Sequence, residues 1–554
     1  MDKLKLDIII TLKDIIKNCF TELGDLETVS IYLETPRDKQ FGDLSTNIAM
    51  QIAKRLNKNP KEIADVILGG LKKSIGSSSL REYIADVKVE GAGFINFYLR
   101  KTLLYESINE ILKKGKDFGR DNIGENKKLQ IEFVSANPTG PLSIAHARQA
   151  AVGDTLANVL SFLGWKVTRE YYINDEGNQI NLLGESVKAR YLELLKKDFC
   201  FPENGYKGKY IYTIAQTLID RFGDSLLNKN TEFFSNFGVK LILKWIKEDL
   251  KKFGIRFDSW FSQKHLSKSN KIKEALKVLR KNGFIYEKDG AVWFKSTAFG
   301  DDKDRVIIKS DSSFTYIAPD IAYHRDKFRR DFARLINIWG PDHHGYIPRL
   351  KAAVSALGFN EKDIAILIVQ LVTLYKDKTP VPMSTREGQF ITLRELIAEV
   401  GRDAARYFFL MRKIDSHLDF DMELAKKQSP ENPVFYIQYA HARISSILKK
   451  TRLKSSSLIN SDLNLLSQPE ELELIKLITR FPDIVKQSGI SLEPYRLIPY
   501  LETLSKTFHN FYDKHRVIGA DRELSKARLA LIETARIVIK NGLNLMGVSA
   551  PMEM

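Results

Sequence analysis

One short segment combines turn-forming and hydroxyl residues with a histidine: Pro138-Thr139-Gly140-Pro141-Leu142-Ser143-Ile144-Ala145-His146. It lies between a strand-like and a helix-like pattern. In an open parallel sheet, ligands bind at such strand ends, where helix N–H groups are offered to phosphate. A histidine in the first helical turn can donate to a phosphate or nucleotide oxygen. The alternative is that His146 merely caps the helix, because short motifs often arise by chance.

A second polar loop reads Gly340-Pro341-Asp342-His343-His344-Gly345. Adjacent side chains on one loop cannot all face the same way, and no cysteine or further histidine nearby completes a zinc set. We therefore predict no metal site here, and nucleotide contacts are the functional interpretation. A polar loop that only closes the strand edge is an equally good alternative.

Tyr316 and Asp320 lie four residues apart and would share one face of a helix, although Pro319 favours a helix that starts just before Asp320. A carboxylate beside a phenol suits a guanidinium or ammonium ligand. From spacing alone, an acid that only stabilises the start of a helix is the favoured alternative.

Aromatic and basic side chains gather in the C-terminal half of the chain. They are Tyr436, Tyr439, His441 and Arg443, then Phe508, His509, Phe511, Tyr512 and Arg516. Such a mixture can stack on and neutralise single-stranded nucleotides. Rings at helical spacing usually form the core of a bundle, which we expect for most of these, with some left exposed for RNA.

The elements around these loops repeat one pattern. Leu129 to Phe133 alternates as a strand, a helix follows with Val152 to Leu163 on one face and Gly164 at its end, and Trp165 to Tyr172 is the next strand. The same order recurs later, where the strand at residues 335–338 leads through the second loop to a helix and the apolar strand at 364–371. Strand, turn, helix and strand form a βαβ unit, which predicts a parallel sheet in an α/β domain.

The flanking regions differ from this central part. The N-terminal stretch mixes helix-like runs with the strand-like VKVEGAGFINFYL, and Lys114 to Lys128 is typical of a linker. From about Leu393 the pattern is helical almost throughout, with breaks near Pro430, at Ser455 to Ser457 and at Pro494. This predicts a separate all-α domain of roughly 150 residues.

Composition limits the class of protein. With 554 residues the chain is too long for one ordinary core, and 44% hydrophobic and 28% charged residues are typical of a soluble globular protein. No window approaches the roughly 18 apolar residues of a membrane span. Cys19 and Cys200 form no metal-binding pattern, which favours a reducing cytosol over a disulfide scaffold. The net charge of +17 suits a polyanionic partner or, equally, a lysine-rich solvated surface.

Long segments of the chain follow one another in a distinctive order. They are TPRDKQFGDLSTNIAMQIAK, IEFVSANPTGPLSIAHARQAAVGD, TREYYINDEGNQI, PENGYKGKYI, FGDDKDRVIIKSDSSFTYIAPDIAYH, INIWGPDHHGYIPRLKAA, TLRELIAEVGRDAARYFFLMR, SHLDFDMELAKKQSPENPVFYIQYAHARI and GVSAP. Together they resemble arginyl-tRNA synthetases of the bacterial kind, from end to end. Many long motifs in the right order are far more specific than any single loop.

The resemblance implies three domains and a set of partners. An N-terminal α+β tRNA-contacting domain would span residues 1–115, a Rossmann-type class I catalytic domain 116–415, and an all-α anticodon-binding bundle 416–554. The implied substrates are ATP with Mg²⁺, L-arginine and arginine tRNA. We expect a cytoplasmic monomer without a membrane segment.

The resemblance also implies site residues. Those along the arginine site would be Glu132, Ser135, Asn137, Tyr316 and Asp320, with Tyr316 and Asp320 on the guanidinium. An acid suits that role because arginine is always charged and its fork matches a carboxylate. The nucleotide side would comprise His146, Asp342, His344, Met383 and Ser384. The residues implied in catalysis are His146, Ser143 and Arg386, and those on tRNA are Tyr436, Tyr439 and Arg443.

Two signature loops depart from the family pattern. The H-x-G-H signature reads Ser143-Ile144-Ala145-His146 here, and the KMSK-type loop reads Pro382-Met383-Ser384-Thr385-Arg386, without either lysine. Arg386, Lys376 or Lys378 would then replace the missing cations. Loss of one donor to transition-state charge typically costs about 10²- to 10³-fold. The hypotheses are therefore an active synthetase, a paralogue that binds tRNA without charging it, and a nucleotidyl transferase with another substrate, which the long helical C-terminal part disfavours.

Overall fold

The computed structural model describes residues 2–23, 29–34, 36, 38–381, 390–451 and 453–554. The chain forms two compact units, and each is assembled from separate segments. The first comprises Met1–Lys116, Leu448–Arg480 and Thr507–Ile537, and the second comprises Asp117–Ile447, Phe481–Lys506 and Val538–Met554. Within the described ranges, no helix has the length and apolar character needed to cross a membrane.

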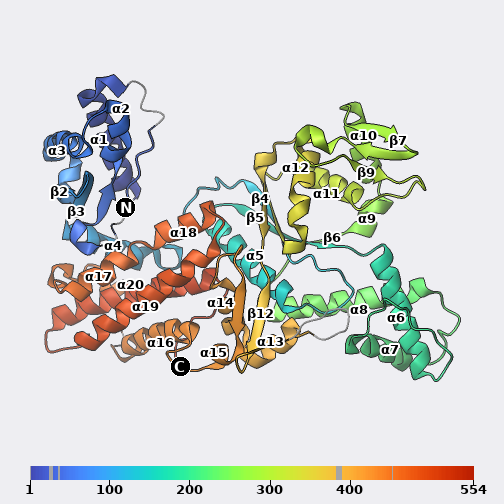
Figure 1. Cartoon of the computed structure of the whole chain (residues 1–554). Helices are drawn as coiled ribbons and strands as arrows, with labels where there is room; N and C mark the ends of the chain where they lie inside the picture. The colour runs from blue at the N-terminus through green and yellow to red at the C-terminus, as the bar shows by residue number, and fades with distance from the viewer. Residues whose placement is uncertain (1, 24–28, 35, 37, 382–389, 452) are drawn as a thin grey trace. The chain divides into compact units, whose positions relative to one another are not determined.

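The first unit contains a small antiparallel sheet packed against helices (Figure 1). Its strands, in the order β1-β3-β2, are β1 (Leu44–Thr46), β3 (Phe94–Leu99) and β2 (Ile84–Glu90). Its helices are α1 (Asp2–Cys19), α2 (Ile48–Leu56), α3 (Pro60–Ser77), α4 (Lys101–Lys114) and α17 (Pro469–Ile478). The β2–β3 hairpin confirms the predicted strand-like segment, and Ile52, Ile63 and Ile67 of the predicted helices are fully buried in its core.

A five-stranded sheet forms the centre of the second unit, and all its strand pairs are parallel. In spatial order the strands are β11 (Ile364–Ile368), β10 (Arg334–Trp339), β4 (Lys128–Glu132), β5 (Lys166–Ile173) and β6 (Ser259–Ser262). The chain builds outward from β4 to β6 and then returns to the other side of β4 at β10. Sheets of this topology bind ligands where that order reverses, outside the carboxyl ends of the two strands.

The first strand of the sheet, β4, is buried on both faces. Leu129 and Ile131 are completely buried, but so is Gln130, and Glu132 is 6% exposed. The alternation seen in the sequence therefore does not mark a solvent face. It marks a polar layer inside the protein, which must be satisfied by internal partners because water does not reach it.

Helix α5 (Ile144–Phe162) connects β4 to β5 and packs against both strands (Figure 1). It is buried over most of its circumference, because α14 (Arg402–Leu410), α13 (Leu393–Val400) and α18 (Phe481–Ile490) cover its other faces. Gly153 allows this packing: a Cβ at that position would lie 2.4 Å from the ring of Phe133.

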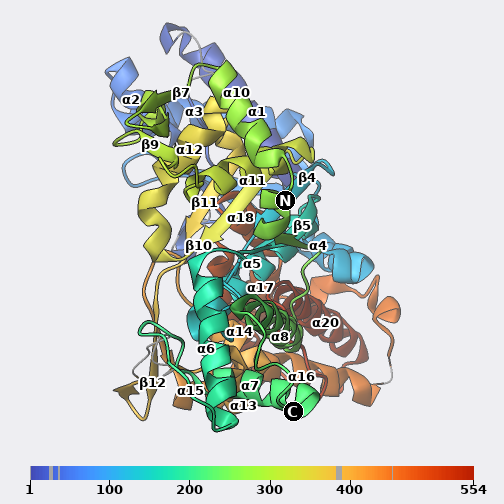
Figure 2. The same ribbon diagram turned by 90° about the vertical axis from the view of Figure 1, so that its right-hand side faces the viewer.

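Two insertions extend the sheet domain. The first lies between β5 and β6 and consists of α6 (Asn178–Leu194), which packs against α7 (Lys209–Phe222) and α8 (Thr231–Lys252) (Figure 2). The second follows β6 and contains α9 (Gln263–Lys268), α10 (Lys271–Lys281) and the antiparallel strands β7 (Ile285–Lys288), β8 (Ala291–Phe294) and β9 (Arg305–Ile308). The chain then enters α11 (Ile317–Arg329), β10, the 3₁₀ turn η7 (Pro341–Tyr346) and α12 (Ile347–Ala356).

The last third of the chain is mainly helical, as predicted, with one exception. Strand β14 (Leu418–Asp421) pairs in parallel with β12 (Val372–Lys376), which also pairs with β13 (Thr379–Pro380). The remaining helices are α15 (Met422–Lys426), α16 (Pro433–Thr451), α19 (Leu497–Lys514) and α20 (Arg522–Leu545). The predicted breaks near Pro430, at residues 455–457 and at Pro494 coincide with the gap before α16 and with 3₁₀ turns.

Within the second unit, a buried guanidinium binds the C-terminal segment to α14 and α5. Arg406 of α14 is fully buried, and its Nη2 donates to Oδ2 of Asp154 at 2.6 Å. Its Nε donates to the carbonyl of Met546 at 2.8 Å. Gly547 follows with φ +67°, and a Cβ there would lie 2.3 Å from Nη2 of Arg406. The end of the chain is therefore part of the packing around α5 and α14.

Candidate active site at the β4 and β10 strand ends

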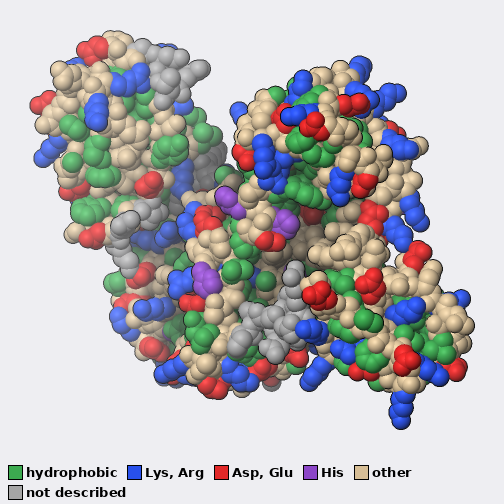
Figure 3. All heavy atoms as spheres, turned by 45° about the vertical axis from the view of Figure 1, so that its right-hand side comes forward, with side chains coloured by type: hydrophobic (Ala, Val, Ile, Leu, Met, Phe, Trp, Pro, Cys, Tyr) green, Lys and Arg blue, Asp and Glu red, His purple; other side chains and the backbone are tan. Residues whose placement is uncertain are grey.

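The strands β4 and β10 are neighbours in register, with Glu132 opposite Asn337. Both strands end at the same edge of the sheet, so the loop after each one opens there. The first loop leads into α5 and the second is η7. Figure 3 shows exposed histidine side chains beside acidic ones near the middle of the visible face.

The backbone directly after β4 is strained. Val134 has φ +67° and Ser135 has φ +38°, in the region that β-branched residues avoid. The N–H of Ser135 donates to the carbonyl of Phe133 at 2.9 Å, which closes a three-residue turn. Such strain persists only where the surroundings over-determine it, and it gathers at ligand sites. Here the turn directs the hydroxyl of Ser135 back toward the sheet. The hydroxyl donates to Oε1 of Glu132 at 3.1 Å and accepts from the N–H of Tyr172 at 3.1 Å.

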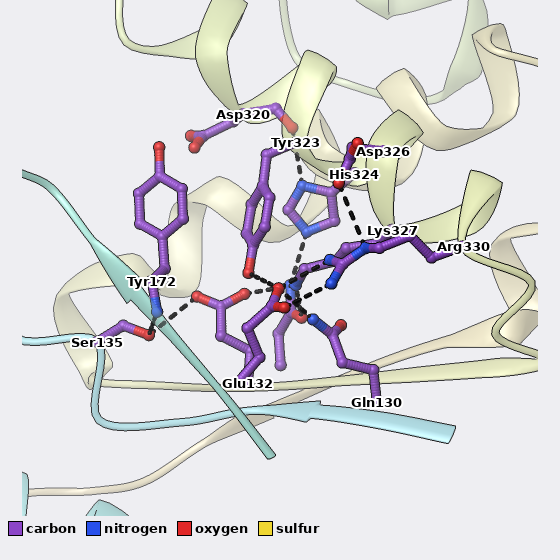
Figure 4. Close-up of polar contacts among 12 residues, drawn as sticks. Gln130, Glu132, Ser135, Tyr172, Asp320, Tyr323, His324, Asp326, Lys327 and Arg330 are labelled. Atoms are coloured by element: carbon purple, nitrogen blue, oxygen red, sulfur yellow. Dashed lines mark hydrogen bonds and ion pairs between the residues drawn. The ribbon is translucent and has the colours of Figure 1, made fainter. Parts of the chain in front are cut away.

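Glu132 takes part in a buried polar chain that the close-up in Figure 4 displays. The ammonium of Lys327, which is 0% exposed, donates to Oε2 of Glu132 and to Oδ1 of Asn337, the latter at 2.9 Å. The amide of Asn337 donates to Nε2 of His324 at 2.8 Å, and Nδ1 of His324 donates to the carbonyl of Asp320 at 2.8 Å. These bonds fix the histidine proton on Nδ1. Burial, together with the nearby ammonium, holds the pKa of His324 well below its usual range, so the ring is neutral.

Asp320 lies in the first turns of α11 and faces the same region as Glu132 (Figure 4). Burial raises its pKa to about 7, and the negative charge of Glu132 adds to this shift. The hydroxyl of Tyr346 donates to Oδ2 of Asp320 at 2.6 Å and acts in the opposite direction, as does the charge of Lys327. Such a raised pKa is typical of a buried carboxyl group that has no cation in direct contact. A positively charged ligand that bound there would stabilise the ionised form.

The helix that carries Asp320 begins earlier than predicted. Its first residue is Ile317 and Tyr316 stands at its N-cap, so Pro319 lies inside the first turn. Proline is tolerated there because the first-turn N–H groups have no helical partner. Tyr316 is 67% exposed, and its hydroxyl accepts from Nη1 of Arg349 at 3.2 Å.

A second buried network lies beneath the first. Glu170 of β5 accepts hydrogen bonds from Arg330, Tyr323 and Gln130. Burial opposes its ionisation, but the guanidinium of Arg330 and the ammonium of Lys327 outweigh this and hold the pKa of Glu170 below its usual range. This network supports α11 against the sheet.

His146 occupies the third position of α5. The N–H of Ser143 donates to Nδ1 of His146 at 3.2 Å, and the Ser143 hydroxyl lies 3.1 Å from the same nitrogen. The capping contact is therefore present, and the ring proton resides on Nε2. Burial lowers the pKa of His146 to about 4, while the charge of Asp342 opposes this shift. The histidine is a neutral hydrogen-bond donor at physiological pH.

The other predicted residues take three different positions. Asn137 donates from Nδ2 to Oε1 of Gln179 on α6 at 2.7 Å, in the loop before α5. Asp342 and His344 are exposed on η7. Tyr436, Tyr439 and Arg443 form a separate half-buried cluster on α16, where the guanidinium of Arg443 bonds the hydroxyl of Tyr439 and lies over its ring at 5.1 Å.

The residues of the KMSK-type loop, Met383, Ser384, Thr385 and Arg386, lie outside the described residues. Of the predicted bundle rings, Phe508 and Phe511 are completely buried, as expected for a helical core. The structure thus brings together Glu132, Ser135 and Asp320, and places Ser143 and His146 on the adjacent helix end.

Sequence reasoning missed several polar residues of the site, namely Lys327, His324, Asn337, Tyr172 and Tyr346. Two signals were available. Asp320, His324 and Lys327 follow one another at spacings of four and three, which puts them on one helix face. Asn337 is the only uncharged polar residue in the strand RLINIW. Tyr172 and Tyr346 carry no such signal, because only the fold brings them to Asp320.

Comparison with family models accounts for nearly the whole chain. Residues 10–99 match the arginyl-tRNA synthetase N-terminal domain, residues 107–416 match the catalytic domain of the class I tRNA synthetases for arginine, and residues 437–554 match the DALR anticodon binding domain. The catalytic model alone covers more than half of the chain. The chain belongs to the arginyl-tRNA synthetase family.

Individual relatives agree with this assignment. The synthetase is 49% identical over 536 residues to the arginine–tRNA ligase of Geobacillus kaustophilus, an alignment that covers 95% of each chain. It is 47% identical over 548 residues to that of Citrifermentans bemidjiense, with 97% of this chain and 98% of the relative covered. The solved arginyl-tRNA synthetase of Thermus thermophilus has the same fold, with a TM-score of 0.78 over 99% of this chain and 100% of that one at 19% identity.

These findings confirm the predicted fold class, a class I catalytic domain flanked by an N-terminal domain and a helical C-terminal domain. The protein is an enzyme, an aminoacyl-tRNA ligase, and its class uses ATP. Nothing in the comparisons supports a paralogue that does not charge tRNA.

Proposed function

We propose that this synthetase activates L-arginine with ATP and transfers the arginyl group to the 3′-terminal adenosine of arginine tRNA. The residues at the ends of strands β4 and β10 would bind the substrates and assist this reaction. The observation that carries the assignment is the pair of acids, Glu132 and Asp320, facing one site at the topological switch point. Only Glu132 has an internal ammonium as partner. The side chain of arginine would supply the missing cation, because its guanidinium is charged at every physiological pH.

The arginine site comprises Glu132, Ser135, Asn137, Tyr316 and Asp320. Asp320 binds the guanidinium, and the exposed hydroxyl of Tyr316 is close enough to the surface to meet the ligand as it enters. Ser135 has two protein partners already, so it orients Glu132 and adds no free donor of its own. Asn137 stands at the mouth of the loop, where its amide reaches Gln179.

The nucleotide side comprises His146, Asp342, His344, Met383 and Ser384, and the catalytic residues are His146, Ser143 and Arg386. In the first step the arginine carboxylate attacks the α-phosphorus of ATP, the bond to the β-phosphate oxygen breaks, and pyrophosphate leaves. Negative charge develops on phosphate oxygens, which positioned N–H donors stabilise. His146 is suited to this because it is a neutral donor whose Nδ1 is held by Ser143.

In the second step the terminal adenosine hydroxyl, the 2′-hydroxyl by class I resemblance, attacks the arginyl carbonyl carbon. The bond to the phosphate oxygen breaks, AMP leaves, and the hydroxyl proton is lost to solvent. The tRNA is held in part by Tyr436, Tyr439 and Arg443 of α16, whose rings and guanidinium suit nucleotide stacking.

Mg²⁺ enters with ATP in this assignment. Over the described ranges, no three His, Cys, Asp or Glu side chains gather closely enough to hold a metal ion. Mg²⁺ prefers to keep several waters and to bind through substrate phosphates, so it needs no dedicated cage. When bound, it would neutralise phosphate charge.

The same proposal includes the domain limits and the state of the protein. We place the tRNA-contacting domain at residues 1–115, the catalytic domain at 116–415 and the anticodon-binding bundle at 416–554, in a cytoplasmic monomer. Sedimentation of the purified protein, with and without tRNA, measures the oligomeric state directly.

The deciding experiment is arginine-dependent exchange of pyrophosphate into ATP, run with and without arginine tRNA, followed by charging of that tRNA. We expect exchange and charging with arginine and none with lysine. Intact tRNA binding with neither exchange nor charging would overturn the proposal.

A further inference from the structure

One face of α11 carries three polar side chains that point into the protein, Asp320, His324 and Lys327 (Figure 4). Lys327 is a lysine with no exposed surface at all. Burying an ammonium is costly unless it is paired and hydrogen-bonded. It donates to Oε2 of Glu132 and to Oδ1 of Asn337. Lys327 has no role of its own in the proposed reaction.

The bonds around Lys327 connect the carboxylate of Glu132 to the backbone of Asp320 without a gap. Starting from Glu132 at the end of β4, they pass through Lys327, Asn337 and His324 to the carbonyl of Asp320. Each donor and acceptor in the chain has only one consistent orientation, because an ammonium can only donate. The chain therefore links the end of β4, the middle of β10 and the start of α11.

The charges in this region explain why such a link is useful. Asp320 is faced by Glu132 of β4, by the hydroxyls of Tyr346 of η7 and Tyr172 of β5, and by Lys327 of its own helix. His324, the other titratable group of that face, is neutral. The carboxylates of Glu132 and Asp320 thus share one low-dielectric region with the ammonium of Lys327, and Glu176 and Asp175 add negative charge near Tyr172. Without that cation they would repel each other and resist ionising together.

We propose that Lys327 is a positioning residue for the amino-acid substrate. It neutralises Glu132 and, through Asn337 and His324, sets the position of Asp320. Asp320 is thereby left without a cationic partner at a fixed place, where the cation of the substrate binds. The inference rests on the proposed function of the site. Lys327 does not touch the substrate. It lowers the negative charge at Glu132 and leaves Asp320 as the acid that meets the cationic end of the substrate side chain.

The test is the full-length variant Lys327→Met, which keeps the aliphatic volume and removes the charge. We expect arginine to bind about 10²-fold more weakly by isothermal titration calorimetry, as when one partner of a buried charge pair is removed. ATP affinity should stay within about threefold of wild type, since the nucleotide residues are unchanged. The pH midpoint of arginine binding should also move upward, because a cation that favours ionised Asp320 has gone.

The matched control is Lys271→Met. Lys271 also pairs with an acid of α11, since its Nζ lies 2.6 Å from Oδ1 of Asp326, but it is 40% exposed and belongs to α10. This variant should bind arginine like wild type and keep the same pH midpoint. A loss equal to that of Lys327→Met would mean that any ion pair on α11 matters, which would overturn the inference.

A second variant covers the case in which Lys327→Met does not fold. Asn337→Leu keeps the ammonium and Glu132 but cuts the link to His324, and we expect arginine affinity to fall by about tenfold with ATP affinity retained. If both variants bind arginine within threefold of wild type at an unchanged midpoint, Lys327 has no positioning role. If Lys327→Met loses ATP and arginine binding in parallel, its role is structural only. Absence of arginine binding in wild type would instead refute the proposed function.

Discussion

The surroundings of Asp320 act on the ionisation of its carboxyl group in opposite directions. Tyr346 and Lys327 favour the carboxylate, while burial and Glu132 oppose it, and burial is the largest effect. Replacing Asp320 with alanine should weaken arginine binding by about 2–5 kcal/mol, the usual cost of removing one half of a desolvated charge pair. Calorimetric titration with arginine measures this. Asp331→Asn, at an exposed position just beyond the C-terminal end of the same helix, is the control and should change nothing.

The raised pKa of Asp320 also predicts a pH dependence. Arginine pairs with the ionised carboxylate, so above pH 7 its affinity should be constant, and below pH 7 it should fall by up to about tenfold per pH unit. The pH dependence of folding stability has the opposite sign. A carboxyl group whose pKa is raised from 3.8 to about 7 favours the native state at low pH, and that contribution is lost as the pH rises towards 7. Titrations at pH 5.5, 6.5 and 8 check the first statement, and the Asp320→Asn variant should bind arginine weakly with no slope.

His146 should contribute to rate rather than to affinity. Removing one donor to developing phosphate charge costs about 10²- to 10³-fold, so His146→Ala should slow arginyl-adenylate formation by that factor and leave arginine binding intact. Because burial lowers its pKa to about 4, His146 should add no inflection to the rate between pH 6 and 8. Pyrophosphate exchange measures both. His265→Ala, an exposed histidine on α9, should behave like wild type, and equal rates for the two variants would remove His146 from the mechanism.

At the scale of elements, the end of α20 is packed against α14. Gly547→Ala should destabilise the protein by about 2 kcal/mol or more, because the new methyl group meets Arg406 and the backbone is left-handed there. Urea unfolding measures the loss, and pyrophosphate exchange should fall with it because Asp154 of α5 loses its geometry. Gly519→Ala, where a Cβ meets nothing within 4 Å, should stay within about 0.5 kcal/mol of wild type.

The elements that position the site were largely predictable from the sequence. Hydrophobic periodicity predicts α5 and β4, and the repeated strand–turn–helix order predicts the parallel sheet, because these patterns depend on local backbone geometry. Strand β14 was missed although Leu418, Phe420 and Met422 alternate with two aspartates, because so short a segment is not distinguished from its helical surroundings and forms a strand by pairing with β12.

The candidate site was predictable only in part, for a related reason. Glu132, Ser135 and Asp320 stand in recognisable motifs, but Lys327 lies in a segment rich in charged residues, as ordinary surface lysines do. Its burial follows from the packing of α11 on the sheet, where Glu132 and Asn337 receive it. The spacing of Asp320, His324 and Lys327 places them on one helix face, but only the tertiary packing decides that this face is buried.

At the scale of the whole molecule, the chain carries a net charge of +17. Figure 3 shows lysine and arginine side chains scattered across the visible face rather than gathered in one place. Binding of tRNA should therefore rest on many weak phosphate contacts and fall by about 10²- to 10³-fold between 50 and 200 mM salt, as expected for roughly four to six neutralised phosphates. Filter binding at both salt concentrations tests this. Non-cognate tRNA should bind more weakly at both, and equal affinity for all tRNAs would contradict an anticodon-reading role.

The second compact unit begins at Asp117 and is completed only by Val538–Met554. A ribosome adds about 5–20 residues per second, so on the order of 20 to 80 s separate the synthesis of Asp117 from that of Val538. During this interval Arg406 lacks the carbonyl of Met546, and α5 and α14 lack part of their packing. The second unit therefore cannot close in the order in which its segments are made. A fragment that stops before Val538 would keep the buried guanidinium of Arg406 without this acceptor, and such a fragment should be more sensitive to proteolysis than the intact unit.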